Sequence, residues 1–346
     1  MANIRDVATR AGVSATTVSR ILNGDKGFAV QEKTRNRVWE AINELGYLPA
    51  NRKPQIKEAA PPAPGVYAIG SVLNITVEGI GDPSFLSILQ GIEEALKQNG
   101  QALTFFRVAN GIDLPDAIAR IPNPLNGFIA MHSLLSEDYS RLANLVEHIV
   151  GIDAHIEGLD SVGYDHYQVG ALAAEHLLAQ GYRSFGFFYG DGDDPLQEQT
   201  LVSFKHAVTA AGGSLRPEHT VLIDNWKQSI CYQKTVEMLS SPNRPRAIYY
   251  ASDLMSVTAI GAVQSLRLSI PNDVAIMGTS NNAMSAYTSP PLTTIDLPLT
   301  DMGKVAVGLL LSRIQGNTSP TQRIHLPVRL IPRASTLRTG EADGPV

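Results

Sequence analysis

The first 57 residues concentrate positively charged side chains that can neutralise the phosphates of a nucleic acid. They contain ten Lys and Arg against five Asp and Glu, a net charge of +5, and since the whole chain carries −5, the remaining residues carry −10. Neutralised phosphates release condensed counterions, which drives nucleic-acid binding. A basic segment ahead of an acidic remainder therefore predicts a DNA-binding module joined to a body with another task.

Two short helices predicted within this basic segment would hold such side chains against DNA. Apolar residues recur at helical spacing from Ile4, and Gly12 interrupts the run because glycine tolerates a positive φ. Ser14 is a good N-cap for a second helix over residues 15–22, and a third helix is predicted over residues 31–45. Two helices joined by a tight Gly-containing turn are typical of the helix-turn-helix, whose second helix enters the major groove. A three-helix bundle with no DNA-binding role is the alternative, and the positive charge disfavours it.

The rest of the chain alternates short apolar runs with amphipathic segments. Strands are predicted at residues 66–72, 102–106, 127–131, 149–152, 184–189, 220–223, 247–250 and 274–278, and helices at residues 84–99, 137–148, 168–180, 198–211, 229–240 and 254–266. Such alternation implies parallel sheets with helices on both faces, and two successive sets imply two similar lobes with a ligand-binding crevice between them. A late helix at 300–315 is expected to return to the first lobe, and a strand at 323–330 to the second.

A Pro/Ala-rich linker ending near residue 65 marks the expected boundary between head and body. We expect a helix-turn-helix domain over residues 1–48, a hinge and linker over 49–65, a two-lobed body over 66–338 and a tail over 339–346. Within the body, lobe 1 is expected over about 66–163 plus 296–320, and lobe 2 over about 164–292 plus 323–338.

Several classes of protein are disfavoured by what the sequence lacks. A single cysteine, Cys231, excludes an intramolecular disulfide and fits a reducing compartment. No apolar run reaches about 18 residues and the N-terminus is a charged helix, so we expect a cytoplasmic protein without membrane contact. No dinucleotide or phosphate loop, nucleophile elbow or metal-ligand spacing occurs, so no cofactor, metal or enzymatic activity is expected. The following histidines are expected at the surface or as helix caps: His132, His148, His166 and His176.

The run from Ile4 to Asn23 (IRDVATRAGVSATTVSRILN) resembles the headpiece of the LacI/GalR family of bacterial transcriptional repressors. The resemblance continues to about Thr336, through Asp82-Pro83-Ser84-Phe85 and the closing Leu330-Ile331-Pro332-Arg333-Ala334-Ser335-Thr336. It implies an all-α headpiece followed by an α/β body of two Rossmann-like lobes, with a crevice between them as in periplasmic sugar-binding proteins.

The resemblance also implies which side chains contact DNA. Ala15, Thr16 and Arg20 fall at the family's base-reading positions, where Arg pairs with guanine and methyl groups contact thymine. Further contacts are implied for Ser14, Thr17, Ser19, Asn23, Lys53 and Ile56. Ile56 takes the place of an apolar wedge on a hinge helix that enters the minor groove. Pro54 departs from the family pattern and disfavours a helix there.

The resemblance also implies an effector pocket between the lobes, lined by Phe85, Asp153, Thr200, Trp226, Ser252, Asp253 and Ser280. Trp226 would stack on a sugar ring or, equally, support the fold, and the polar residues would bind sugar hydroxyls. Thr200 stands where the family commonly has Arg, which favours a neutral saccharide over an acidic or phosphorylated effector. Residues 75–85 and 151–153 are most similar to the evolved β-galactosidase repressor branch, which points to a galactoside.

The sequence thus predicts a homodimeric repressor of a carbohydrate-utilisation operon, released from double-stranded operator DNA by a small sugar. Only a short tail follows residue 336, without the leucine heptads of tetrameric members, so a dimer is expected. A regulator that the ligand activates as a corepressor and a solute-binding protein are the alternatives. The basic head and the absent signal peptide disfavour the second of these.

Overall fold

The computed structural model describes residues 3–22, 30–31, 33–35, 37–38, 41, 65–74, 83–109, 118, 125–131, 136–190 and 195–337. The chain divides into two compact units, Met1–Ala60 and Pro61–Val346, each of which is described by itself. No helix of these residues is long and apolar enough to cross a lipid bilayer.

The first unit contains helix α1 (Ile4–Ala11) and helix α2 (Ala15–Leu22). Asn3 caps α1 by accepting backbone N–H bonds from the first turn, and Gly12 ends the helix with φ 64°. The predicted third helix is helical at residues 33–35, 37–38 and 41, and its other residues lie outside the described part of the chain. A small apolar core joins the three segments through Val7, Ala8, Ala11, Val18, Val38 and Ala41.

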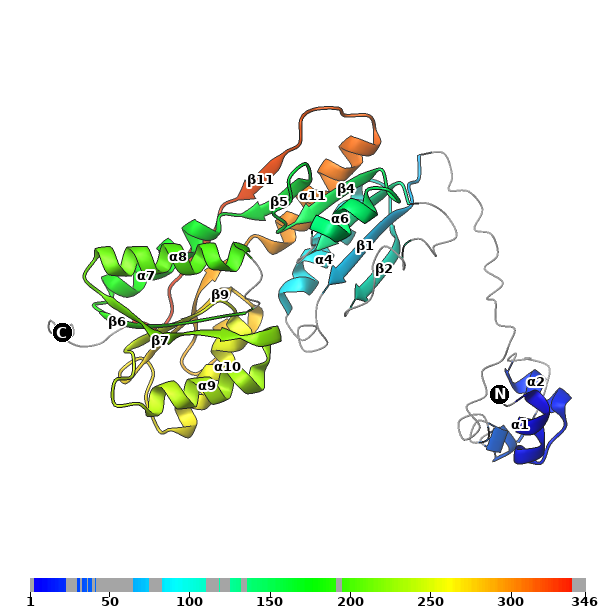
Figure 1. Ribbon diagram of the computed structural model, residues 1–346, viewed down its shortest axis with the longest axis horizontal. Coiled ribbons are helices and arrows are strands. Elements are labelled where there is room, and N and C mark those ends of the chain that lie inside the picture. Colours follow the sequence, from blue (N-terminus) through cyan, green and yellow to red (C-terminus); the bar gives the residue numbers. More distant parts are fainter. Residues whose placement is uncertain are drawn as a thin grey trace. The chain divides into compact units, whose positions relative to one another are not determined.

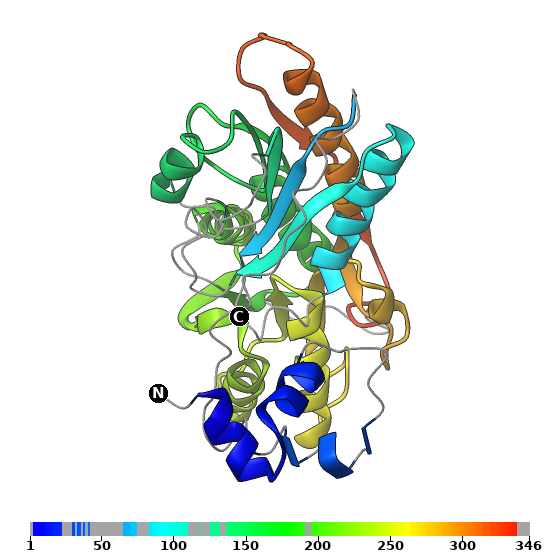
Figure 2. The same ribbon diagram turned by 90° about the vertical axis from the view of Figure 1, so that its right-hand side faces the viewer.

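The first lobe of the second unit is built on a parallel sheet. Its strands, in spatial order, are β11 (Arg323–Leu326), β5 (Asp160–Tyr164), β4 (His148–Ile152), β3 (Gly127–Met131), β1 (Ile69–Asn74) and β2 (Leu103–Ala109). Helices α4 (Pro83–Gln98) and α11 (Leu299–Ile314) lie side by side on one face, as Figure 2 shows in cyan and orange. Helix α6 (Ser136–Leu142) covers the other face, where its Leu142 joins the cluster of Phe128 and Ala130.

The second lobe repeats this arrangement. Its strands, in spatial order, are β12 (Arg329–Ile331), β10 (Thr293–Asp296), β9 (Ala275–Ser280), β8 (Ala247–Tyr250), β6 (Ser184–Gly190) and β7 (Ser214–Ile223). Only β12 runs antiparallel to its neighbour in this sheet. Helices α7 (His166–Ala179) and α8 (Pro195–Ala210) cover one face, and α9 (Gln228–Ser240) and α10 (Asp253–Ser265) cover the other (Figure 1).

The predicted headpiece and the two α/β lobes are confirmed. The helix predicted over 137–148 ends at Leu142, the strand predicted over 220–223 begins at Ser214, and two further strands differ from the prediction. The prediction of a single strand over 323–330 in the second lobe is wrong in part. Strand β11 pairs with β5 in the first sheet, and only β12 joins the second sheet. Pro327 lies between them and has no N–H to continue a ladder, so the segment divides there. Strand β5 was not predicted, since its sequence, DSVGY, has little apolar character.

Two pairs of helices cross so closely that only glycine fits at the contact. A methyl group added to Gly303 of α11 would overlap the backbone of Ile88 in α4, and one added to Gly91 would overlap the carbonyl of Thr300. In the second lobe, Gly170 of α7 lies in the same way against the backbone of α8. These contacts fix each helix pair at one spacing on its sheet.

The chain passes between the two sheets three times, after β5, after β10 and between β11 and β12. Near the return to β11, the guanidinium of Arg313 donates two hydrogen bonds to the Asp160 carboxylate, at 2.6 and 2.9 Å. Burial alone would raise the pKa of Asp160, but the bonds from Arg313 and from the Gln322 backbone outweigh it and lower that pKa. The pair anchors the loop that leads from α11 into β11.

His176 of α7 corrects the expectation that it is a surface or capping residue. It is 8% exposed, and its Nε2 lies 2.7 Å from the Thr336 hydroxyl, which in turn contacts the hydroxyl of Thr293. Burial lowers the pKa of His176 because it disfavours the charged ring. His148 is partly exposed, whereas His132 lies outside the described residues.

This lowered pKa predicts that the protein loses stability in mild acid. Below the unfolded-state pKa of about 6.5, the His176 ring is protonated in the unfolded chain but stays neutral in the folded chain until the pH reaches its lowered folded-state pKa. The free energy of unfolding therefore falls as the pH falls through this range. One such histidine contributes a slope of at most about 1.4 kcal/mol per pH unit. Urea unfolding between pH 5 and 8 should show the slope, and His176→Gln should reduce it. His148→Gln is the control, and an unchanged slope in His176→Gln would contradict the assignment.

Candidate DNA-binding helix and effector site

Helix α2 presents a polar surface on the side opposite to its buried face. Val18 is fully buried in the headpiece core, whereas Thr16 and Arg20 are exposed. Because Thr16 and Arg20 are four residues apart, they lie on the same side of the helix, one turn from each other. An exposed hydroxyl and guanidinium at this spacing can reach the edges of neighbouring bases.

The other residues predicted to contact DNA in and beside α2 differ in how far their side chains are buried or hydrogen-bonded within the headpiece. Ala15 packs partly against the headpiece core. The hydroxyl of Ser14 caps α2 by accepting the backbone N–H of Thr17 at 3.1 Å. Ser19 is half-buried. The predicted contacts that lie outside the described residues are Asn23, Lys53 and Ile56.

In the second unit, two predicted pocket residues from different lobes are joined through a histidine. His166, the first residue of α7, is 2% exposed, and its Nε2 lies 2.9 Å from Oδ1 of Asp153 at the end of β4. Its Nδ1 lies 3.3 Å from the hydroxyl of Thr200 in α8. The ring also stacks on Tyr164, with ring centroids 4.3 Å apart. The structure therefore brings Asp153 and Thr200 together, although neither contacts the other directly.

His166 was assigned by sequence reasoning to the surface or to a helix cap, and that expectation is wrong. The residue follows the hinge segment after β5, so whether its ring faces solvent or the first lobe depends on how the two sheets meet. The sequence signal that could have pointed to it is its position one residue after Asp165, the N-cap of α7. A side chain at the first helical position beside a lobe crossing is well placed to reach the other lobe.

Ser252, Asp253 and Ser280 lie at the carboxyl ends of β8 and β9. The Ser252 hydroxyl caps α10 by accepting the Leu254 N–H at 3.1 Å. Asp253 is 1% exposed, and both of its carboxylate oxygens accept hydrogen bonds from the following segments of the lobe. The Ser280 hydroxyl is buried without a hydrogen-bond partner. Of the three, Ser280 thus has the unused hydrogen-bonding group.

The two aromatic residues predicted for the pocket both contact apolar cores. Phe85 of α4 is half-buried against the large core cluster of the unit. Trp226 ends the short helix η2 (Asp224–Trp226) with φ 54°, and its indole packs so closely on Gly190 that an added methyl group would overlap the ring. It is half-buried, so one part of the indole remains accessible beyond the carboxyl end of β7.

A cavity of about 330 Å³ opens beside Asp153 at the junction of the lobes. Its walls come from the first lobe through β5 and Arg323, and from the second lobe through Tyr167, Leu196 and Gln199. Carboxylate, amide and phenol groups around a cavity of this size suit a small polar ligand.

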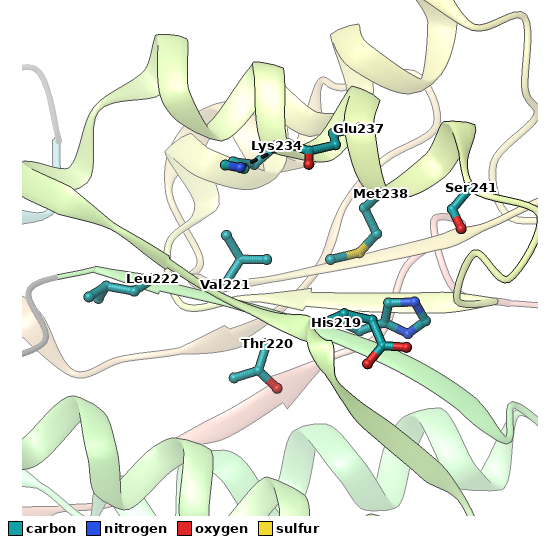
Figure 3. Close-up of a pocket in the computed structure, with 9 residues that line it drawn as sticks. His219, Thr220, Val221, Leu222, Lys234, Glu237, Met238 and Ser241 are labelled. Atoms are coloured by element: carbon teal, nitrogen blue, oxygen red, sulfur yellow. Dashed lines mark hydrogen bonds and ion pairs between the residues drawn. The ribbon is translucent and has the colours of Figure 1, made fainter.

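A second cavity, of about 420 Å³, lies between β7 and α9, and none of the predicted site residues lines it (Figure 3). His219 is 3% exposed there, and its Nδ1 has no hydrogen-bond partner. Burial is the main cause that lowers the pKa of His219. Lys234 and Glu237 form an exposed ion pair on the helix above it.

Cys231, the single cysteine of the chain, is a core residue of the second lobe. Burial raises the pKa of the Cys231 thiol to about 12, so this side chain is protonated and packs in the core of the second lobe. No group of three or more metal-ligating side chains occurs within the described ranges.

The architecture defines a class of protein, a two-lobed α/β body preceded in the sequence by a helix-turn-helix head. Residues 3–50 match the model of bacterial regulatory proteins of the lacI family, and residues 174–336 match the periplasmic binding protein-like domain. The HTH-type transcriptional repressor MelR of Bacillus subtilis (strain 168) is 31% identical over 348 residues, which cover 97% of this chain and 97% of MelR. The chain belongs to the LacI family of bacterial regulatory proteins and is a transcriptional repressor of that family, as its relatives are, and not an enzyme.

Two solved structures extend this similarity to the whole architecture. The complex of the transcriptional regulator CelR with cellobiose has a TM-score of 0.69 and 25% identity, and the match covers 97% of this chain and 100% of CelR. The lac repressor dimer bound to operator and the anti-inducer ONPF has a TM-score of 0.70 and 25% identity, with 97% of this chain and 99% of that chain covered.

Proposed function

We propose that this repressor controls a carbohydrate-utilisation operon, binds its operator as a homodimer, and is released by a small neutral sugar held between its lobes. A galactoside is the first candidate for that sugar. Two headpieces are needed because a palindromic operator presents two half-sites about one helical turn apart. The dimeric lac repressor on its operator is the structural precedent for this arrangement.

One backbone observation supports the effector site more than any other. Among the described residues, five that are not glycine have a positive φ: Asp153, Trp226, Arg267, Ser280 and Asn281. Three of these, Asp153, Trp226 and Ser280, were predicted as pocket residues. Asp153 and Trp226 follow the carboxyl ends of β4 and β7, and Ser280 is the last residue of β9. Strained backbone of this kind persists where the surroundings hold it in place, and it clusters at ligand sites.

The chemistry of these positions favours a neutral, hydroxyl-rich ligand. Asp153 supplies an acceptor, Ser280 supplies a buried hydroxyl without a partner, and Trp226 supplies an aromatic face. Thr200, at the position where an arginine would pair with an anionic group, offers a neutral hydroxyl, which lies 3.3 Å from Nδ1 of His166. CelR was solved with cellobiose, a neutral disaccharide, in its complex.

The experiment that tests the proposed function is a gel shift on DNA upstream of the chain's own gene. We expect a specific complex with a palindromic segment in the absence of ligand and its release by one sugar from a panel that includes galactose, lactose and cellobiose. A complex that forms only when a sugar is present would show the corepressor mode instead. If no ligand state produced a specific complex at moderate salt, the proposed function would be wrong.

Arg20→Ala tests the assignment of the recognition helix. Loss of a bidentate guanine contact should lower the specific operator affinity about 10- to 100-fold. Non-specific affinity for random duplex DNA should fall only slightly, because a single phosphate-neutralising charge is lost. Competition gel shifts with operator and random duplex measure both quantities.

Arg5→Ala is the matched control, since Arg5 is an exposed arginine on α1 rather than α2. It should lower operator and random-duplex affinities to a similar, small extent. If Arg20→Ala behaved in the same way as Arg5→Ala, the role of Arg20 in reading bases would be refuted.

A further inference from the structure

The bond between His166 and Asp153 crosses from one lobe to the other. Asp153 belongs to the first lobe, where its N–H donates to the carbonyl of Val162 at 2.8 Å. His166 belongs to the second lobe, as the first residue of α7. Their 2.9 Å contact is nearly shielded from water, because the side chains are 2% and 13% exposed.

The chemistry of the partners indicates which ring nitrogen of His166 donates to Asp153. An ionised carboxylate only accepts hydrogen bonds, so the Nε2 of His166 donates to Asp153. In the neutral ring, Nδ1 then carries the lone pair, and the hydroxyl of Thr200 donates to it. With Tyr164 stacked on one face, the imidazole is held by contacts from both lobes.

These contacts fix the orientation of the Asp153 carboxylate. Its backbone is held in the left-handed region at φ 53°, and its Oδ1 is held by His166. Asp153 also lines the cavity at the lobe junction. With Oδ1 fixed, the plane of the carboxylate is set, and Oδ2 is the oxygen left to accept a hydrogen bond from a ligand.

We propose that His166 is the positioning residue of the effector site, which holds Asp153 across the lobe boundary so that Oδ2 accepts a hydroxyl of a neutral sugar or polyol. This inference rests on the proposed function in one respect, that the effector binds beside Asp153. The Asp153 carboxylate repels anionic groups, so the site disfavours phosphorylated and carboxylated ligands. Binding of the ligand to Asp153 therefore depends on the hydrogen bond that His166 makes across the lobe boundary.

Two substitutions at His166 separate its two hydrogen bonds. In His166→Gln, the amide nitrogen stands at about the reach of Nε2 and retains a donor for Asp153. In His166→Asn, the shorter amide stands at about the position of Nδ1 and can contact only Thr200. A structural role in packing α7 would make both variants similar, whereas positioning of Asp153 predicts that only Gln preserves it.

The first measurement needs no ligand. Hydrogen–deuterium exchange with mass spectrometry should show at least about tenfold faster exchange of peptides covering residues 150–156 in His166→Asn, and near wild-type exchange in His166→Gln. His176→Asn is the matched control, because it removes a buried histidine of the same helix whose partner, Thr336, lies in the second lobe. Equal exchange in His166→Asn and His166→Gln would overturn the inference, as would an equal effect of His176→Asn on residues 150–156.

The second measurement uses the sugar from the panel that dissociates the wild-type complex. By calorimetry, His166→Asn should bind it about 10- to 100-fold more weakly and His166→Gln about as well as wild type, since a hydrogen bond to a charged group is at stake. If no sugar binds the wild-type protein, the proposed effector is wrong, whereas the exchange experiment still decides the role of His166.

Discussion

Asp253→Ala should lower the free energy of unfolding by at least about 3 kcal/mol. Asp253 is 1% exposed and accepts hydrogen bonds from the Asn282 N–H at 2.8 Å and from the hydroxyls of Ser285 and Thr294 at 2.5 and 2.6 Å. Alanine leaves these buried donors without an acceptor, which costs more than the bonds themselves contribute. Urea unfolding followed by circular dichroism measures the loss.

Asp253→Asn should be less damaging than Asp253→Ala. Its single amide oxygen can still accept the bonds from Asn282 and Ser285, and only Thr294 faces an N–H group instead. Asp301→Ala, at an exposed position in the first turn of α11, is the control and should cost less than about 1 kcal/mol. A loss of that small size for Asp253→Ala would contradict the role given to the carboxylate.

Gly303→Ala should destabilise the protein by about 3 kcal/mol, the upper part of the range for overpacking. The added methyl group would overlap the carbonyl oxygen of Ile88 and approach the nitrogen of Ile92 to 2.8 Å. Both obstacles are backbone atoms of α4, so no side chain can rotate away and the two helices must separate. Thermal and urea unfolding of the purified variant measure the effect.

Gly308→Ala in the same helix is the matched control and should have the opposite sign. Nothing lies within 4 Å of a methyl group at Gly308. Alanine loses less backbone entropy than glycine on folding, so a gain of up to about 1 kcal/mol is expected. If both variants were neutral, the close contact between α4 and α11 would not matter to stability.

Asp253 was predicted as a pocket residue, yet its carboxylate organises the segments around Asn282 and Thr294. A loss of sugar response in Asp253→Ala would therefore reflect the fold as much as the ligand. Ser280, with its buried hydroxyl unpaired, is the more informative position for testing ligand contact.

The alternation of strands and helices was predictable because each buried parallel strand is a short, continuously apolar run. Strands β3 and β8, GFIAM and AIYY, are fully buried, and their predicted bounds coincide with the observed ones. Strand β5 is also fully buried but reads DSVGY, so apolar content could not identify it. Its place in the sheet depends on pairing with β4, which precedes it across a loop, and with β11, which is distant in sequence.

Residues of the candidate site were predictable only where the residue type and its position in the sequence indicated a role in ligand binding. Asp153 and Thr200 were predicted separately, but the imidazole that joins them was not, because its contact is made between two lobes. Likewise His176 and Thr336 are 160 positions apart, and only the closing segment of the chain brings them into contact. Contacts between residues so far apart in the sequence depend on the chain topology, which the pattern of residue types alone does not specify.

The placement of β11 and β12 has a consequence for how the protein is made. Each of these strands completes one sheet by pairing with an edge strand made earlier, which is β5 for β11 and β10 for β12. During synthesis, both edges therefore stay open until residues 323–331 have left the ribosome, and open edges invite association with other chains. A nascent chain cannot finish one lobe before starting the next, so the two lobes mature together at the end of translation.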